Sequence, residues 1–99
     1  MGAELRVAPE VERDIADAYA WYDQQRPGLG REFNLCVDAC ISAICRAPEL
    51  NPVFHENYRR RTLRRFPYAV FYEYEAGTVT VYCIIHTARD PNKWRQRLP

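Results

Sequence analysis

Most of the predicted sheet lies in residues 58–87, which read YRRRTLRRFPYAVFYEYEAGTVTVYCIIHT. This stretch is rich in the β-branched and aromatic side chains that favour strands. Phe66-Pro67 interrupts it because proline cannot donate a ladder hydrogen bond, and Ala76-Gly77 has the composition of a tight hairpin turn. The stretch therefore predicts a three-stranded meander, with strands at residues 58–65, 68–75 and 78–87.

The first part of the chain has a different pattern, in which a short strand at residues 4–7 precedes two helices. Apolar residues recur every three or four positions over residues 9–25, as expected for an amphipathic helix. Residues 26–30, RPGLG, end this helix, since proline cannot continue it and glycine accepts left-handed backbone angles. A second amphipathic helix follows at once and ends near Ala47, and residues 48–57 form a connector.

The two helices each have a predicted buried stripe, and the first also has a predicted acidic, solvated side. The stripes consist of Val11, Ile15, Ala18, Tyr19 and Tyr22 in the first helix and of Phe33, Val37, Cys40, Ile41 and Ile44 in the second. The acidic side consists of Glu10, Glu12, Asp14 and Asp17.

These elements predict an α+β fold of order β-α-α-β-β-β, in a single domain that spans residues 1–99. The helical hairpin packs on one face of a small, mainly antiparallel sheet, because a lone three-stranded sheet cannot bury both of its faces. A short C-terminal helix or tail follows the sheet. A chain of 99 residues with 47% hydrophobic content suits one compact domain and excludes large multidomain enzyme folds.

The register of the last hairpin depends on its turn. A two-residue loop and a three-residue loop with a bulge differ by one residue, and this difference exchanges the two faces of a strand. We expect the two-residue loop at Ala76-Gly77. It turns Glu73, Glu75, Thr80, Tyr82 and His86 outward. The residues that this loop turns toward the helices are Tyr68, Val70, Tyr72, Tyr74, Val79, Val81, Cys83 and Ile85.

Charges are divided unevenly along the chain, although the net charge is only +1. Residues 1–50 carry five Arg against nine Asp and Glu, which gives −4. Residues 51–99 carry eight Arg and one Lys against four acids, which gives +5. Because arginine makes planar, bidentate contacts with carboxylates and phosphates, the second half of the chain favours an anionic partner.

Five arginines occupy seven positions of the first meander strand. Strand alternation divides them between two faces, with Arg59, Arg61 and Arg65 on one and Arg60 and Arg64 on the other. One interpretation is that they protect an exposed edge strand from aggregation. The other is a binding surface for phosphate groups or for an acidic peptide.

The sequence favours a cytoplasmic protein with reduced cysteines and no cofactor. No segment has the length of a membrane span, and the N-terminus lacks the form of a signal peptide. Cys36 and Cys40 lie one helical turn apart, but neither His55 nor His86 adds a ligand at zinc-site spacing. We therefore interpret the thiols as small buried apolar groups. The four are Cys36, Cys40, Cys45 and Cys83.

The tail, residues 86–97, has a second group of chemically active side chains. His86 titrates near neutrality and Arg89 stabilises a developing phosphorane charge, so the pair has the chemistry for metal-free RNA cleavage. The alternative is that His86 makes structural hydrogen bonds at the end of a strand. Asp90-Pro91 predicts the start of a short helix whose Trp94 and Leu98 dock on the body of the protein.

Five pieces of this sequence, spread over nearly the whole chain, occur together in a fixed order. They are Pro9-Glu10 with Asp14-Ile15; Trp21-Tyr22; Pro27-Gly28-Leu29-Gly30 with Phe33; Arg64-Arg65-Phe66-Pro67-Tyr68 with Val70-Phe71-Tyr72-Glu73; and His86-Thr87-Ala88-Arg89-Asp90-Pro91 with Trp94. Taken in this order, they resemble the RelE/ParE superfamily of toxins from bacterial type II toxin–antitoxin modules, many of them known as plasmid stabilisation proteins.

The resemblance implies one of two activities. RelE-like members cut messenger RNA in the ribosome without a metal, whereas ParE-like members inhibit DNA gyrase and have no established catalytic residues. Ala69 stands where RNase members tend to carry the Arg of an R-x-x-Y pattern, and Trp94 stands where they often present a catalytic Tyr. The pI near 7.7 is also modest for a protein that enters ribosomal RNA. These observations favour a ParE-like gyrase inhibitor over an enzyme.

Both branches imply a cognate antitoxin whose acidic C-terminal segment folds onto the basic face. Two alternatives stay open: a ribosome-dependent RNase that uses Arg64, His86 and Arg89, and a relic that binds antitoxin without being toxic. The residues predicted to contact the target or the antitoxin are Arg60, Arg61, Arg64, Arg65, Arg89 and Trp94.

Overall fold

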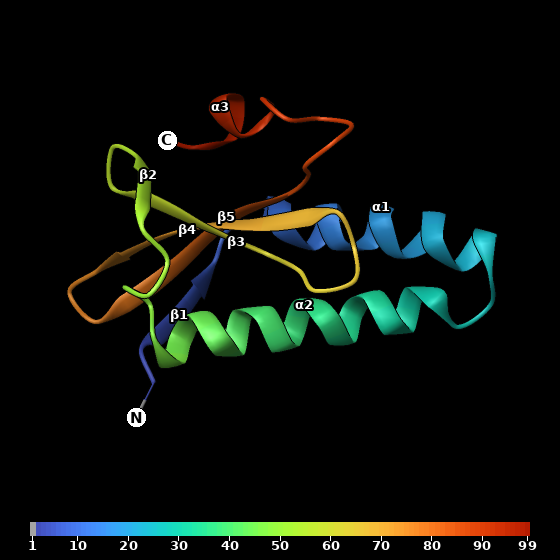
Figure 1. Ribbon diagram of the computed structural model, residues 1–99, viewed down its shortest axis with the longest axis horizontal. Coiled ribbons are helices and arrows are strands. Elements are labelled where there is room, and N and C mark those ends of the chain that lie inside the picture. Colours follow the sequence, from blue (N-terminus) through green and yellow to red (C-terminus); the bar gives the residue numbers. More distant parts are fainter. Residues whose placement is uncertain (1) are drawn as a thin grey trace.

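The computed structural model describes residues 2–99 and contains five strands and three helices (Figure 1). In chain order they are β1 (Glu4–Val7), α1 (Glu10–Gln25), α2 (Leu29–Arg46), β2 (Val53–His55), β3 (Tyr58–Thr62), β4 (Tyr68–Glu75), β5 (Thr78–His86) and α3 (Trp94–Arg97). No helix in this part of the chain is long and apolar enough to cross a membrane.

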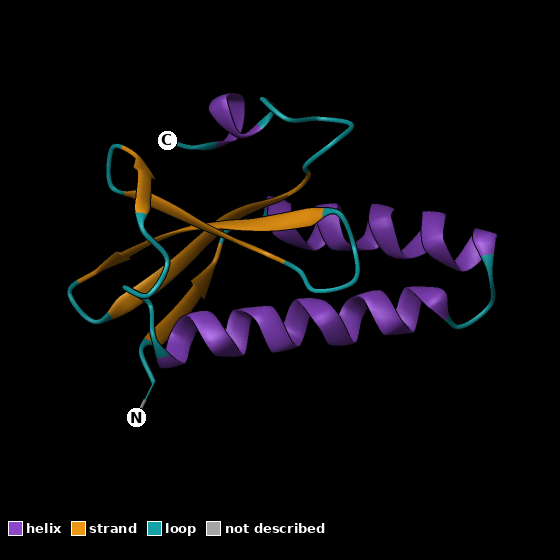
Figure 2. Ribbon diagram, viewed as in Figure 1, coloured by secondary structure: helices purple, strands orange, loops and turns teal. Residues whose placement is uncertain are grey.

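The strands form one sheet in the order β1-β5-β4-β3-β2 (Figure 2). β1 pairs with β5 in parallel, and all other neighbours are antiparallel. α1 and α2 form a helical hairpin on one side of the sheet, and α3 lies on the other (Figure 1). The predicted α+β fold, with its helical hairpin and short C-terminal helix, is confirmed.

Two strand predictions were wrong. Residues 53–55, expected in a connector, form the edge strand β2, which pairs with Tyr58 and Arg59. β3 was expected to reach Arg65 but ends at Thr62. The chain turns early because Pro67 has no N–H for the ladder, and the Leu63 N–H donates to the Tyr68 carbonyl across the turn.

The main core lies between the helical hairpin and the sheet, and its aromatic centre consists of Tyr22, Phe33, Phe66 and Tyr68. The predicted helix stripes are largely buried. Tyr19 is an exception, since it is 38% exposed and lies over Gly30, where α1 and α2 approach closely. The remaining buried residues of this core are Val11, Ala18, Val37, Cys40, Ile44, Leu63, Val70, Tyr72, Val79, Val81 and Ile84.

The hairpin between β4 and β5 has the expected two-residue loop, with φ of 51° at Ala76 and 78° at Gly77. Glu75 pairs with Thr78, as predicted. The pairing then shifts by one residue at a bulge, since Tyr72 pairs with Val81 whereas Phe71 pairs with Cys83.

Because of this bulge at Tyr82, the faces predicted for the second half of β5 are wrong. Cys83 and Ile85, expected toward the helical hairpin, lie on the opposite face of the sheet. His86, expected outward, lies on the hairpin side, where its ring contacts Tyr68 edge to face. The extra residue reverses the alternation, so every side chain after it changes face.

The outer face of the sheet has a smaller apolar core under α3. Trp94 packs against Phe71, with ring centroids 6.2 Å apart, and against Phe54, at 4.9 Å. Leu98 is partly buried against the same cluster, so the predicted docking of Trp94 and Leu98 is confirmed. The buried members of this core are Ala69, Phe71, Cys83, Ile85 and Trp94.

Candidate functional site

The five arginines of the segment 59–65 point to different places, because the strand ends at Thr62 and the chain then bends. Arg59 is structural: its Nη1 donates to the Asn51 carbonyl at 2.6 Å and to the Glu49 carbonyl at 3.3 Å. Arg65 forms an ion pair with Glu32 of α2, at 2.6 Å. The strand alternation predicted through Arg65 therefore applies only as far as Thr62.

Arg60 is exposed on the outer face, where its guanidinium carbon lies 5.4 Å from the centroid of the Phe54 ring. This is a cation–π contact at the border of the small core under α3. Trp94 lies in that core and is only 7% exposed, so its ring is used mainly for packing.

Arg61 and Arg64 line a groove of about 240 Å³ between α2 and β3. Arg46, in the last turn of α2, lines the same groove. Nothing in the sequence distinguishes Arg46 as a site residue, because a basic residue at a helix C-terminus is common and stabilises the helix dipole. Only the folded chain brings it to Arg61 and Arg64.

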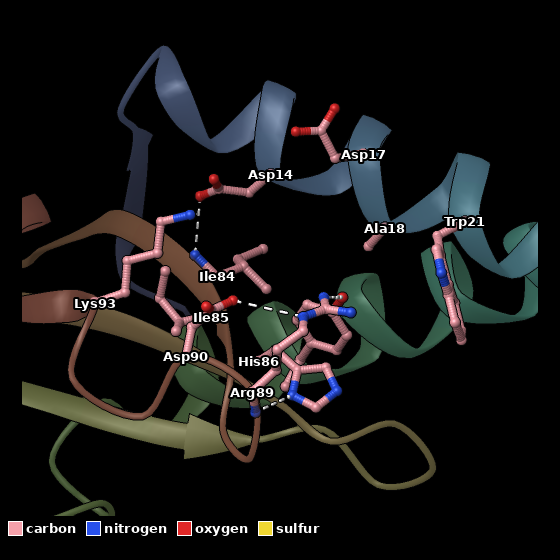
Figure 3. A pocket seen from close by; sticks show the side chains of 11 residues that line it. Asp14, Asp17, Ala18, Trp21, Ile84, Ile85, His86, Arg89, Asp90 and Lys93 are labelled. Carbon is pink, nitrogen blue, oxygen red and sulfur yellow. Dashed lines mark hydrogen bonds and ion pairs between the residues drawn. The ribbon is translucent and has the colours of Figure 1, made fainter.

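His86 and Arg89 line a different cleft, of about 280 Å³, on the α1 side of the sheet (Figure 3). Asp14, Asp17 and Trp21 of α1 line one side of this cleft, and His86 and Arg89 line the other. The cleft carries acidic and basic groups together, since Asp90 and Lys93 also line it.

The His86 ring is fixed by the turn that follows it. Its Nδ1 accepts hydrogen bonds from the backbone N–H groups of Ala88, at 3.2 Å, and Arg89, at 2.8 Å. Burial lowers the pKa of His86 below its ordinary value, the charge of Arg89 lowers it further, and Asp90 partly opposes both. The neutral form, with its proton on Nε2, is therefore favoured. This hydrogen bonding corresponds to the structural alternative considered for His86.

Arg89 is held over the end of the sheet by two neighbours. Its Nη2 donates to the Tyr68 hydroxyl at 3.2 Å, and its Nε lies 3.7 Å from the Asp90 carboxylate. These contacts orient the guanidinium, but its side chain remains 55% exposed and accessible to a partner.

Asp14, predicted on the solvated side of α1, is instead mostly covered and held in an ion pair. Arg97 of α3 donates to both carboxylate oxygens, at 2.8 and 2.9 Å, and the Ile84 N–H donates to Oδ2 at 3.1 Å. Nothing in the helical pattern of α1 separates Asp14 from Glu12 or Asp17. Its partner comes from the other end of the chain.

The six predicted contact residues therefore do not form one site. Arg61 and Arg64 share the groove between α2 and β3, Arg89 lies in the cleft beside His86, and Arg65 is paired with Glu32. Arg60 and Trp94 belong to the outer face. Among residues 2–99, no group of three or more His, Cys, Asp and Glu is placed to hold a metal ion.

Comparison with known proteins gives consistent results. A family model described as the ParE toxin of the type II toxin–antitoxin system parDE matches residues 5–91. The protein named Toxin ParE2 in Mycobacterium tuberculosis, strains CDC 1551 / Oshkosh and ATCC 25618 / H37Rv, is 32% identical over 93 residues, which are 93% of this chain and 89% of the relative.

A solved structure described as a chromosomal ParDE TA system from P. aeruginosa has the same fold. The match has a TM-score of 0.75 and covers 85% of this chain and 95% of the other, at 14% sequence identity.

Proposed function

The chain belongs to the ParE toxin family of type II toxin–antitoxin systems, and from this premise we propose that it inhibits DNA gyrase and is neutralised by a cognate antitoxin. The first part of the proposal follows the ParE-like branch of the resemblance. The second follows from the family's two-component organisation, which is also the organisation in the description of the solved P. aeruginosa system.

One observation supports gyrase inhibition over mRNA cleavage: Arg64 lines a different cavity from His86 and Arg89. Cleavage of a phosphodiester by acid–base chemistry needs a proton-transfer group and a charge-stabilising group around one phosphate. The three side chains of the RNase hypothesis do not meet around such a point. His86 also has its Nδ1 engaged by two backbone N–H groups, so only Nε2 faces a substrate.

One observation supports the RNase alternative. His86 and Arg89 line the same cleft, and the Arg89 guanidinium is more than half exposed there. A phosphate that entered this cleft would meet one imidazole N–H and one guanidinium, although the Asp17 and Asp90 carboxylates that also line the cleft would repel it.

The deciding experiment is expression of the chain without antitoxin in a bacterial host that carries an SOS reporter. A gyrase inhibitor induces the SOS response and filamentation while transcripts stay intact, and the purified chain inhibits supercoiling by purified gyrase. Immediate arrest of translation with cleaved transcripts, and no SOS induction, would establish the RNase alternative instead. Normal growth at full expression would indicate a relic that has lost toxicity. A gyrase inhibitor acts in the cytoplasm, so the proposal also assigns the chain to that compartment.

A further inference from the structure

The strand β1 forms one edge of the sheet and has an open outer side. β5 lies on one side of β1, and no other strand within residues 2–99 lies on the opposite side (Figure 1). All four residues of β1 are exposed, including the apolar Leu5, at 46%, and Val7, at 43%. An open, partly apolar strand edge is a template for pairing with another strand.

The hydrogen bonds beside β1 show which of its backbone groups point away from the sheet. The N–H groups of Glu4 and Ala8 donate to carbonyl groups on the β5 side, at 3.0 and 2.9 Å. Because backbone groups alternate in direction along a strand, the N–H and C=O groups of Leu5 and Val7 point to the open side. Two donors and two acceptors are therefore available to a further strand.

This open edge is short, because other groups close it at both ends. The Ala3 N–H donates to the Cys45 carbonyl at 2.9 Å, so the C-terminal end of α2 covers the edge at that point. Pro9, just before α1, has no N–H to donate. The surface for pairing therefore spans residues 4–8.

The charges of β1 favour a second copy of the same strand. Glu4 and Arg6 lie on one face of the strand, and neither forms an ion pair among residues 2–99. When two such strands pair in antiparallel fashion, Glu4 of one copy lies close to Arg6 of the other, and the two-fold axis repeats the contact. The open edge of β3 beyond β2 instead carries Arg60 and Arg61, like charges that repel a second copy.

We propose that two copies of this chain pair through β1 in antiparallel fashion and form a two-fold symmetric dimer with one continuous sheet. Leu5 and Val7 exchange main-chain hydrogen bonds with Leu5 and Val7 of the second copy and cover each other's side chains. Glu4 and Arg6 form ion pairs across the axis. No residue of β1 lines the groove between α2 and β3 or the cleft beside His86, so each copy keeps both cavities for other partners.

A charge exchange tests the pairing, with the dimer dissociation constant measured by analytical ultracentrifugation. Glu4→Arg and Arg6→Glu should each raise this constant by about tenfold or more, because each turns two attractive contacts into two repulsive ones. The double variant has both charges exchanged and should return to within about threefold of the wild type. Glu12→Arg and Arg13→Glu, exposed on α1, change the net charge by the same amounts and are the matched controls.

Three outcomes of this experiment would overturn the proposal. A chain that stays monomeric up to about 1 mM does not pair through this edge. A dimer that the single variants leave unchanged uses another surface. A loss that the double variant fails to restore means that the two charges do not meet across the axis.

A proline variant tests the backbone contact. Leu5→Pro removes an N–H that points away from β5, so it should weaken the dimer by about tenfold or more while the circular dichroism spectrum stays that of the wild type. Arg6→Pro is the contrast, because it removes an N–H that points toward β5 and should destabilise the fold. A folded Leu5→Pro variant that dimerises as the wild type does would refute the pairing.

Hydrogen exchange followed by NMR gives a readout on the wild-type chain. The Leu5 and Val7 amides should exchange about tenfold or more slowly in concentrated solution than in dilute solution, because dimerisation engages them. The amides of Arg60 and Arg61, at the other open edge, should exchange at the same rate in both. A dimer that leaves the Leu5 and Val7 amides unprotected would refute the proposal, and the proposed inhibition of gyrase does not depend on the result.

Discussion

Asp14 and Arg97, 83 residues apart in sequence, are joined by two hydrogen bonds of 2.8 and 2.9 Å, with side chains only 13% and 19% exposed. Asp14 also accepts the Ile84 N–H of β5, two residues after the bulge at Tyr82. One carboxylate thus connects α1, α3 and the irregular part of the sheet. The pair therefore holds the C-terminal segment over the outer face together with the packing of Trp94 and Leu98.

Removal of either partner should destabilise the fold. Arg97→Ala leaves a mostly buried carboxylate without its counter-charge, and we expect a loss of about 2–3 kcal/mol in the free energy of unfolding, measured by urea denaturation. Gln96→Ala, in the same helix but exposed, is the control and should change stability little. A loss below about 0.5 kcal/mol for Arg97→Ala would mean that α3 is held by the packing of Trp94 and Leu98 without help from the ion pair.

The cysteines should differ widely in reactivity. Burial raises the pKa of the Cys40 thiol to about 11 and that of Cys83 to about 12, so both carry little thiolate at neutral pH. At about pH 8, iodoacetamide should modify Cys36 well before Cys40 or Cys83 in the folded chain. All four should react in urea, which is the control. Rapid modification of Cys83 in the native protein would contradict its place under α3.

Gly30 is required by the contact between the two helices. A β-carbon at this position would stand 2.8 Å from the Tyr19 carbonyl oxygen, a backbone atom, so α1 and α2 would have to separate. Gly30→Ala should cost about 1–3 kcal/mol, despite the better helix propensity of alanine, as measured by thermal or urea unfolding. Ser42→Ala on the exposed side of α2 is the comparison. A stabilised Gly30→Ala variant would show that the helices separate at no cost.

Stability should decrease in mild acid because of His86. Its pKa in the folded chain is lowered, first by burial and then by Arg89, so the unfolded chain binds a proton more readily than the folded one. The stabilising contribution is present above the ordinary histidine pKa of about 6.5 and is lost as the pH falls through the lower, folded value. His86→Asn should reduce this pH dependence of the urea midpoint, whereas His55→Asn should retain it. Equal slopes for the wild type and His86→Asn would refute the explanation.

The sequence predicts those parts of the fold that follow from local periodicity and turn chemistry. The helical hairpin and the Ala76-Gly77 turn both have local signals. The parallel position of residues 4–7 is the exception. The bulge at Tyr82 has none, because it arises from packing on both faces of β5 at once. One extra residue therefore reversed the predicted faces of Cys83, Ile85 and His86.

For the candidate site, the sequence predicts which residue types are present but not where they lie in the fold. The arginines of the segment 59–65 are obvious in the sequence, but which of them find partners depends on residues far along the chain, such as Glu32 for Arg65. Arg46 carries no signal of its own, and Asp14 resembles the other acidic residues of α1. Long-range ion pairs have no sequence period, so the division into two separate cavities required the folded structure.

The separation of Arg64 from His86 leads to a prediction about toxicity. Residues that act as one catalytic unit have strongly non-additive effects, whereas independent contact sites have additive ones. Arg64→Ala, His86→Ala and the double variant should each be assayed for the concentration that halves gyrase supercoiling. Because the two side chains line different cavities, the fold-changes of the single variants should multiply to within about twofold in the double variant. Ser42→Ala, on the exposed side of α2, is the control for changes in inhibition that any substitution and purification would cause. A double variant no weaker than His86→Ala alone would mean that the two residues do not act independently on gyrase, and the prediction of two separate contact sites would be wrong.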